Sequence, residues 1–406
     1  MVLVVAILAA CEPTKNTNDQ QHTETFEKGS FGYDLAFLQT KDSVVVLGNS
    51  DAQVIVSPRF QGKVFTSTAT GLRGQSFGWI NYDALNADTL APHINAYGGE
   101  DRFWLAPEGG QYSIFFKPGS QMVFDNWQTP AALDTEPWDK IAVSATQVAM
   151  QKSMQLQNYA GTQFDVLLQR AVQLLDANDL MTNLGVATDT AVKWVGFATN
   201  NSVTNAGKQP WTKNTGTLSI WVLSMLNPIE NGAIIIPYRM GKEEDLGPVA
   251  TTNYFGDIPA SHIQFKDGVI YFKADGKYRS KLGLSYKRAT PVAGSYDSKT
   301  GTLTIMQFVL PTKEAPYINQ LWEMQKNPFN GDVINAYNDG PLEGGGQLGP
   351  FYELESSSPA AFLTPGKSIS HTQRMYHFTG AETHLDPICK KVLGVSLQQI
   401  KSAFEK

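Results

Sequence analysis

Two glutamates spaced two residues apart offer the most direct chemistry in this chain. Glu353 and Glu355 lie in GPFYELESSSPA, residues 349–360, where an apolar run is typical of a strand. Because side chains alternate along a strand, Phe351, Glu353 and Glu355 point to one face. A rise of about 3.3 Å per residue puts the two carboxyl groups roughly 6 to 7 Å apart, within the range of acid–base pairs. We therefore predict Glu353 and Glu355 as catalytic residues. The alternative, a solvated face, accounts less well for Phe351.

A second group of polar residues lies in HINAYGGEDRFWLAPEGG, residues 93–110, around two pairs of glycines. Paired glycines let a backbone turn tightly and let a ligand come close. Carboxylates accept hydrogen bonds from sugar hydroxyls, arginine donates in a fork, and tryptophan stacks on the apolar face of a sugar ring. The candidate substrate-binding residues in this stretch are His93, Tyr97, Glu100, Asp101, Arg102, Trp104 and Glu108. The alternative is a surface hairpin in which Asp101 and Arg102 form local ion pairs.

Asn338 and Asp339 complete the predicted substrate-binding set and follow the alternating run of GDVINAYNDGP, residues 331–341. Oxygen ligands of the kind that calcium takes are present in Glu100, Asp101, Glu108, Glu353 and Glu355. No spacing among them is specific for a metal, and the six histidines are scattered. We therefore expect no cofactor, with calcium as the open alternative.

The Asn- and Thr-rich stretch at residues 200–228 carries two tryptophans, Trp211 and Trp221. A large aromatic side chain in an alternating segment packs in the core or against a sheet edge more often than it binds a ligand. We interpret both tryptophans as packing residues.

The N-terminus, MVLVVAILAAC, is a short apolar run that closes on small residues and a cysteine. This pattern resembles a bacterial lipoprotein signal, although it lacks a basic start, and an ordinary secretory signal is the alternative. We expect residues 1–11 to be the signal, Cys11 to be lipidated, and residues 12–25 to form a flexible tether. The chain would then be attached to a membrane of the bacterial cell envelope, by lipid because ten apolar residues are too few to span a bilayer.

The composition is that of a folded, mainly β protein. Of 406 residues 42% are apolar, enough for a large core, whereas only 17% are charged and 35 are glycine. Turn signals recur at Asp267–Gly268, at Asp275–Gly276 and over residues 297–301, at the spacing of a β-sandwich. The net charge is −6 with no cluster of Lys or Arg, so the chain offers no surface for a nucleic-acid backbone.

Two segments of the chain indicate helices. Residues 163–175 fit both a strand and a helix by period, and we predict a strand to about residue 175 followed by a short helix capped by Asn178 or Asp179.

At the C-terminus, Asp386 with Pro387 is typical of a helix start, Gly394 of a stop, and Ser396 of a second cap. We expect one β domain over residues 26–388, with a short helical segment over 389–406 packed on it. The remaining cysteine, Cys389, is expected to be a small buried side chain.

The segment LESSSPAAFLTPGKSISHTQRMYHF resembles the closing segment of the aldose 1-epimerases, or galactose mutarotases. The residues that match that family in order are Leu354, Glu355, Pro359, Pro365, Gly366, Thr372, Tyr376 and Phe378. VSPRFQGKVFTSTATG is similar to the family's N-terminal hairpin, and residues 201–207 to its middle strand. The resemblance covers most of residues 35–378 and implies the β-supersandwich fold. It also implies that Glu355 is the general base that takes the proton of the anomeric hydroxyl.

The chain departs from that family where the family uses histidines. Tyr97 stands before Gly98 and Gly99, where the epimerases have a histidine, and no histidine lies between His93 and His262. A mutarotase needs an acid at the ring oxygen together with the base. The sequence therefore leaves three functions open: an acid–base carbohydrate enzyme using Glu355, a non-catalytic glycan-binding lipoprotein, or a structural surface lipoprotein. We expect a carbohydrate ligand for either of the first two and leave enzymatic activity undecided.

Overall fold

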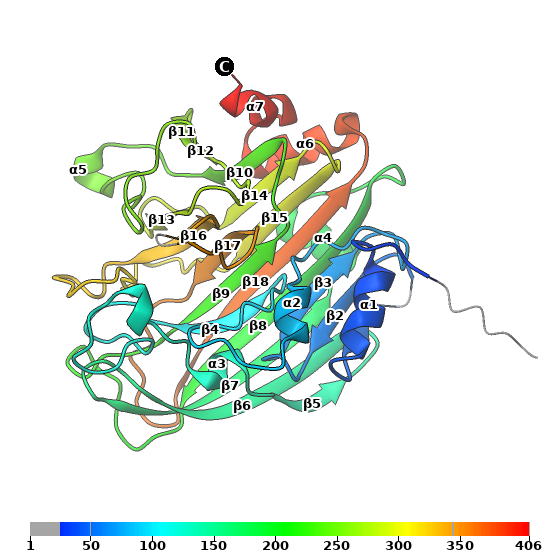
Figure 1. The fold of residues 1–406 in the computed structure, drawn as a ribbon. Helices are drawn as coiled ribbons and strands as arrows, with labels where there is room; N and C mark the ends of the chain where they lie inside the picture. Colours follow the sequence, from blue (N-terminus) through cyan, green and yellow to red (C-terminus); the bar gives the residue numbers. More distant parts are fainter. Residues whose placement is uncertain (1–24, 49, 343–344, 406) are drawn as a thin grey trace, which may run out of the picture.

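The computed structural model describes residues 25–48, 50–342 and 345–405. Its strands form three sheets, of ten, five and three strands (Figure 1), and every pairing between named strands is antiparallel. The predicted all-β class with a short C-terminal helical segment is therefore confirmed.

The ten-stranded sheet forms one long layer of the molecule (Figure 1). From edge to edge its strands are β11 (Ile263–Lys266), β12 (Val269–Phe272), β10 (Gly232–Pro237), β14 (Val292–Asp297), β15 (Thr302–Phe308), β18 (Ser368–Thr379), β8 (Lys193–Asn205), β7 (Gln163–Leu174), β6 (Gln147–Gln157) and β5 (Asp139–Val143). Along β6 and β7 buried residues alternate with more exposed ones, as period-2 strands with one covered face require.

The five-stranded sheet packs against this layer and carries the residues of greatest functional interest. Its order is β13 (Ser280–Ser285), β16 (Asp332–Asn338), β17 (Tyr352–Ser357), β9 (Ser219–Leu226) and β4 (Arg102–Ala106). All residues of β16, β17, β9 and β4 are buried, because both faces of this sheet are covered. A large apolar core fills the space between the two sheets, with Phe103, Val222 and Leu354 among its fully buried members.

The three-stranded sheet and the helices close the remaining faces. The small sheet consists of β1 (Val45–Leu47), β2 (Gln53–Ser57) and β3 (Lys63–Thr68). The helices are α1 (Phe31–Gln39), α2 (Tyr82–Asn86), α3 (Ala131–Asp134), α4 (Ala177–Leu184), α5 (Glu243–Leu246), α6 (Glu382–Leu393), α7 (Leu397–Lys401), and the 3-10 turns η1 (Phe124–Asn126) and η2 (Ser402–Phe404).

Residues 163–174, whose sequence period fits both a strand and a helix, form the strand β7. Helix α4 follows this strand. The N-cap of α4 is Asp176, whose side chain accepts hydrogen bonds from the backbone N–H of Asn178 and Asp179. The predicted caps, Asn178 and Asp179, were therefore wrong by two or three residues. Asp179 instead supplies the reciprocal half of a capping box, since its side chain accepts from the backbone N–H of Asp176.

The C-terminal helices α6 and α7 lie against one end of the ten-stranded sheet (Figure 1). Helix α6 begins at Glu382, and Pro387 lies inside it rather than opening it as predicted. Gly394 ends the helix in a left-handed conformation, and Ser396 caps α7, both as predicted. Cys389 is free and fully buried in this layer.

Two turn predictions had different outcomes. The turn at Asp267–Gly268 joins β11 to β12 as a hairpin. The turn at Asp275–Gly276 does not form one, because the chain leaves the ten-stranded sheet there and continues as β13 of the five-stranded sheet. This crossing matters because β13 carries a lysine to the site described below.

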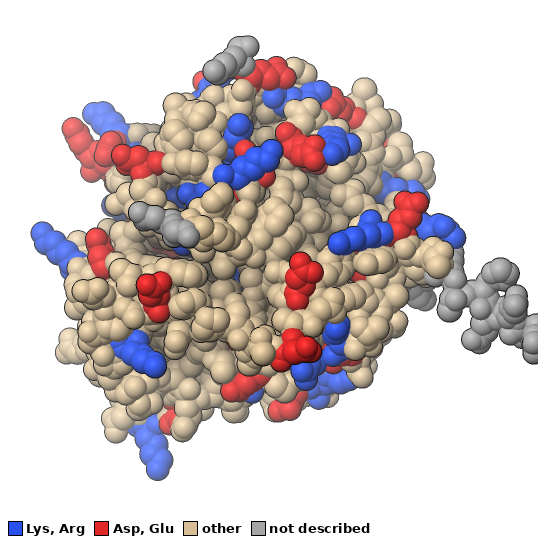
Figure 2. Space-filling model, viewed as in Figure 1, with Lys and Arg blue, Asp and Glu red and all other residues tan. Residues whose placement is uncertain are grey.

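Cys11 and the predicted signal lie outside the described residues, as does almost all of the predicted tether. Within the described part, none of the helices has the length and apolarity needed to cross a membrane. On the face drawn in Figure 2, Lys and Arg are interspersed with Asp and Glu, and no broad basic patch is visible.

Candidate functional site

The strand β17 presents its alternate residues as the sequence predicts. Phe351 and Glu353 line a pocket on one face of the five-stranded sheet. Tyr352 and Ser356 point to the opposite face, where they contact Ser295 and His371 of the ten-stranded sheet. The two glutamates therefore lie on the face away from the large sheet, as their spacing indicates.

Arg102 reaches this pocket from β4, which pairs with β9, which in turn pairs with β17. Within residues 98–110 only Arg102–Ala106 form a strand, but every residue of this stretch is buried rather than part of a surface hairpin. Because alternate residues of β4 share a face, Arg102 and Trp104 both line the pocket.

The pocket encloses about 530 Å³ of empty space, including its open mouth. The five-stranded sheet forms its floor, and loops around residues 94, 124–127, 255, 322 and 348 form its walls. Its lining residues are mostly aromatic or aliphatic with a few charges: Ile94, Arg102, Trp104, Glu108, Phe124, Trp127, Trp221, Leu223, Met225, Phe255, Arg279, Lys281, Trp322, Tyr337, Leu348, Phe351 and Glu353. Apolar walls with a few placed polar groups are typical of small-molecule sites.

Two ion pairs cross the floor of the pocket. Arg102 donates through Nη2 to Glu353 Oε1, and Lys281 Nζ lies 2.9 Å from Glu355 Oε2. Trp221 Nε1 also donates to Glu355 Oε2, at 2.8 Å. Glu355 is fully buried and does not line the pocket, so of the predicted catalytic pair only Glu353 faces the space directly.

Each cation of the pocket also lies over an aromatic ring. Arg102 Cζ is 4.9 Å from the centroid of Trp104, and Lys281 Nζ is 4.8 Å from that of Trp221. Each cation–π contact holds a charged group over the face of an aromatic ring. The positions of charge in the pocket are therefore set before any ligand binds.

The pocket perturbs the acidity of its carboxyl groups. Burial raises the pKa of Glu353 to about 7, although Arg102 opposes the shift, and the nearby charge of Glu355 adds to it. Burial likewise raises the pKa of Glu108, against the attraction of Lys281. Burial alone would lower the pKa of Lys281, but the carboxylates around it, Glu355 first, outweigh that effect and raise it. A carboxyl group with a pKa near 7 can both give and take a proton at neutral pH.

Glu100 and Asp101 point away from this pocket. Asp101 lies between the two sheets, where it accepts hydrogen bonds from Arg170 Nη2 at 2.5 Å, Gln373 Nε2 at 3.0 Å and Thr199 Oγ1 at 3.2 Å. It therefore pairs with Arg170 and not with Arg102, so the alternative of a local ion pair between Asp101 and Arg102 is wrong.

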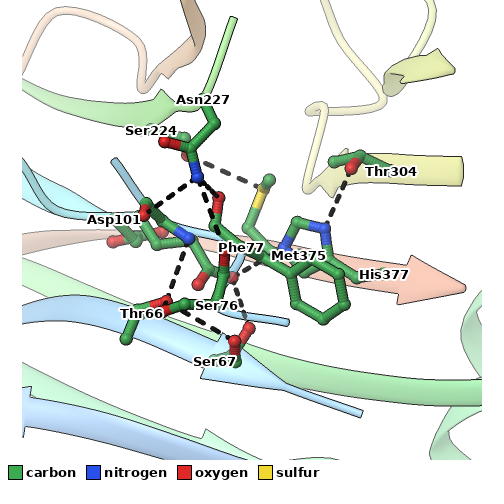
Figure 3. A network of polar contacts seen from close by, with 12 residues as sticks. Thr66, Ser67, Ser76, Phe77, Asp101, Ser224, Asn227, Thr304, Met375 and His377 are labelled. Carbon is green, nitrogen blue, oxygen red and sulfur yellow. Dashed lines mark hydrogen bonds and ion pairs between the residues drawn. The ribbon is translucent and has the colours of Figure 1, made fainter. Parts of the chain in front are cut away.

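Glu100 belongs to a neighbouring buried network, part of which is drawn in Figure 3. Glu100 Oε1 accepts from Ser67 Oγ and lies 2.7 Å from His377 Nε2, while His377 Nδ1 lies 2.9 Å from Thr304 Oγ1. Phe77 stacks on the imidazole ring. This network connects the small sheet to β15 and β18, so the position of Glu100 is structural.

The other predicted binding residues support the site from outside or lie apart from it. Tyr97 packs on Phe60, away from the pocket. His93 Nδ1 lies 2.7 Å from the carbonyl oxygen of Trp127 and holds that wall residue in place. Asn338 Nδ2 donates to Asp275 Oδ1 at 3.0 Å and so orders the turn before β13.

Asp339 acts on the pocket through another residue, because its Oδ1 accepts a hydrogen bond of 2.7 Å from the hydroxyl of Tyr337, which lines the pocket. Of the predicted set, the structure thus gathers Arg102, Trp104, Glu108 and Glu353 around one space, with Glu355 beneath it.

Sequence reasoning missed several lining residues, above all Lys281, Arg279 and Trp322. Trp221 was interpreted as a packing residue. It is buried, but it also lines the pocket and binds Glu355. One signal was available: Arg279 and Lys281 have the same two-residue spacing as Glu353 and Glu355, with opposite charge.

The acidic residues that offered calcium ligands do not gather into a metal-binding group. Among the residues that the structure describes, no three His, Cys, Asp or Glu side chains are placed to hold a metal ion. Glu100 and Asp101 face the interior, whereas Glu108 and Glu353 face the pocket.

Several solved structures are similar to this chain at low sequence identity. A galactose mutarotase-like protein from Lactobacillus casei ATCC 334 is 12% identical, with a TM-score of 0.47, over 82% of this chain and 100% of that one. The Slr1438 protein from Synechocystis sp. PCC 6803 is 14% identical, with a TM-score of 0.49, over 83% and 96%. A GalM/aldose epimerase homologue from C. elegans is 12% identical, with a TM-score of 0.42, over 84% and 100%.

A family model matches residues 29–404, nearly the whole described chain. The chain belongs to this family, which is described as a family of unknown function (DUF6786). No curated protein matches the chain.

Proposed function

We propose that the pocket on the five-stranded sheet binds a carbohydrate and carries out acid–base chemistry on it. The observation that carries the proposal is Glu353, a carboxyl group with a pKa of about 7 placed among indole rings in the pocket. Indole rings stack on the apolar faces of sugars, and a group that titrates near neutral pH transfers protons efficiently.

In this proposal Glu353 exchanges a proton with the bound sugar, and Arg102 orients it. Glu108 is the second proton-transfer group, since it lines the same pocket and its pKa is also raised by burial. A ring-opening step at an anomeric centre needs one group to take the hydroxyl proton and another to protonate the ring oxygen. The base role of Glu355 stays a prediction. Its buried carboxylate, held by Lys281 and Trp221, makes it the residue that positions Lys281.

Non-catalytic sugar binding is the second candidate function, and two observations favour it. Glu353 and Glu355 are both engaged in ion pairs, and no histidine lines the pocket within the described part of the chain. A site built only for recognition would use these charges to bind hydroxyl groups.

Magnetisation-exchange NMR on the anomeric protons of a panel of free sugars separates these functions. We expect exchange cross-peaks with the wild-type protein, and none above the uncatalysed level with Glu353→Gln. Line broadening without exchange would support binding alone. Exchange that survives Glu353→Gln but is lost in Glu355→Gln would show that Glu355 is the proton-transfer residue and would overturn the role given to Glu353.

We also propose that the protein is attached to the bacterial cell envelope through a lipid on Cys11. The support is the sequence pattern that ends at this cysteine. Metabolic labelling with a fatty acid should label the wild type and not Cys11→Ala, and an unlabelled wild type would refute the anchor.

A further inference from the structure

Arg279 differs from the other two cations of the pocket. Arg102 is paired with Glu353 and Lys281 with Glu355. Arg279 is half-buried and lines the same pocket, yet within the described chain no carboxylate lies at ion-pair distance from it. Its charge is partly removed from solvent, and an anionic partner would offset the cost of that partial burial.

The guanidinium of Arg279 is nevertheless held in a fixed place. Its Cζ lies 3.7 Å from the centroid of Phe255, and its Nε donates to the hydroxyl of Tyr337 at 3.4 Å. The Tyr337 hydroxyl donates in turn to Asp339. No described residue accepts a hydrogen bond from either Nη group, so the two-pronged end of the guanidinium is free to bind a ligand. That end matches a carboxylate or a phosphate with two parallel hydrogen bonds.

Two further donors at the pocket lack partners. Arg102 Nε and Trp127 Nε1 are both buried without a hydrogen-bond acceptor, and both residues line the pocket. Against them stands one unpartnered acceptor, Glu355 Oε1, beneath the floor. A buried donor without an acceptor is unfavourable, so each of these groups would gain from an acceptor oxygen able to reach it.

The balance of charge points the same way. Three cations line the pocket, Arg102, Arg279 and Lys281, but only two carboxyl groups do, Glu108 and Glu353. Glu353 is paired with Arg102, and Lys281 is paired with Glu355 beneath the floor. Arg279 is therefore the one cation of the described lining that no ion pair neutralises.

We propose that the sugar bound in this pocket carries an anionic group, a carboxylate or a phosphate, and that Arg279 binds that group. The proposal rests on the carbohydrate-binding function proposed above and names its substrate class. The sugar ring lies among the indoles beside Glu353, and its anionic substituent extends toward the free end of Arg279.

Isothermal titration of the full chain with matched ligands tests this proposal. The probes are glucose, glucuronate, the methyl ester of glucuronate and glucose 6-phosphate, with the galactose series in parallel. Charge-assisted hydrogen bonds should make an acidic sugar bind roughly 10- to 100-fold tighter than the neutral sugar. The methyl ester should bind like glucose, because it keeps the shape and removes the charge. The uronate and phosphate arms show which anionic group the pocket prefers.

Three variants locate the effect. Arg279→Gln should remove the preference for acidic sugars, so that glucuronate and glucose bind this variant with similar affinity. Arg279→Lys keeps the positive charge but cannot form the two parallel hydrogen bonds of a guanidinium. This variant should retain part of the preference for acidic sugars. Arg59→Gln is the matched control, because Arg59 also lies over a phenylalanine, 5.5 Å from the Phe60 centroid, but outside the pocket. It should change neither affinity.

The outcomes separate this proposal from the function on which it rests. If neutral and acidic sugars bind equally, or if Arg279→Gln weakens both to the same extent, the anionic substrate class is refuted while sugar binding stands. If no sugar of the panel binds, both are refuted. Should Arg279→Gln fail to fold, the comparison of glucuronate with its methyl ester in the wild type decides alone.

Discussion

Asp101 and Arg102 are neighbours in the chain but belong to two different charged regions. Asp101 lies between the sheets and binds Arg170, Thr199 and Gln373 of the large sheet. Arg102 lies on the opposite face and binds Glu353 beside an open pocket. The difference shows that buried charges of similar type serve two purposes here: the interior group ties two sheets together, whereas the pocket group stays beside a space that a ligand can fill.

A buried base between the sheets and a buried acid in the pocket have pKa shifts in opposite directions. Between the sheets, burial lowers the pKa of His371 to about 4 and so keeps its imidazole neutral. In the pocket, burial raises the pKa of Glu353 to about 7 and so favours its neutral acid form. Burial disfavours the charged form of both groups. The contributions of the two groups to the free energy of unfolding therefore change with pH in opposite directions.

Loss of the interior ion pair is expected to have the largest effect. Asp101→Asn leaves the fully buried guanidinium of Arg170 without its counter-charge, and this should lower the free energy of unfolding by about 3–5 kcal/mol. Urea denaturation measures it. The matched control is Asp51→Asn, which removes the partner of Lys193 in an exposed pair and should cause little change. Equal effects of the two variants would show that the Asp101 pair does not tie the sheets together.

Glu353 should make the protein less stable as pH rises. Its pKa rises from 4.5 to about 7 on folding, so the stability that its protonated form contributes is complete below pH 4.5 and is lost by about pH 7. Relative to Glu353→Gln, the wild type should lose up to about 3 kcal/mol of unfolding free energy across that window. Urea denaturation at several pH values gives the difference. A flat difference would contradict the shifted pKa.

His371 should show the opposite slope. Its pKa falls from 6.5 to about 4 on folding, so its contribution is complete above pH 6.5 and is lost as pH falls toward 4. Relative to His371→Gln, the wild type should lose up to about 3 kcal/mol between pH 6.5 and 4. The same denaturation series measures it. A slope of the same sign as that of Glu353 would break the comparison between the regions.

An indole of the pocket wall should matter for ligand affinity more than for folding. Trp322 is half-buried and lines the pocket, so Trp322→Ala should weaken sugar binding roughly tenfold. Trp194→Ala is the control, because Trp194 is also half-buried but stacks on Phe378 outside the pocket. Titration of both variants with the best-binding sugar compares them. Equal losses of affinity would show that the effect is a general loss of packing.

The period of β17 was enough to predict which face carries Glu353 and Glu355, because alternation is a local property of a strand. The sequence could not show that Lys281 pairs with Glu355. The order β13, β16, β17, β9, β4 is not the order of the chain, and β13 enters this sheet only after the crossing at residues 275–276. Long-range pairing of this kind depends on tertiary packing, not on any local pattern.

The same limit explains why Glu100 and Asp101 were placed in the wrong region. The stretch GGEDRFW shows that charged residues are concentrated here, but it does not show where each side chain points. Glu100, Asp101 and Arg102 lie just before or at the start of β4, and their side chains have different surroundings. Arg102 and Trp104 share the pocket face because they are two residues apart within β4. Glu100 and Asp101 precede that strand, and their partners, His377 and Arg170, come from distant strands of the large sheet.

A crystal structure of the protein soaked with the sugar that binds best would test the carbohydrate site most directly. We expect the sugar ring between the indole walls, with a hydroxyl group within hydrogen-bond distance of Glu353 and any anionic substituent at Arg279. Sugar bound on another surface, with the space beside Glu353 left unfilled, would contradict the assignment of this pocket as the functional site.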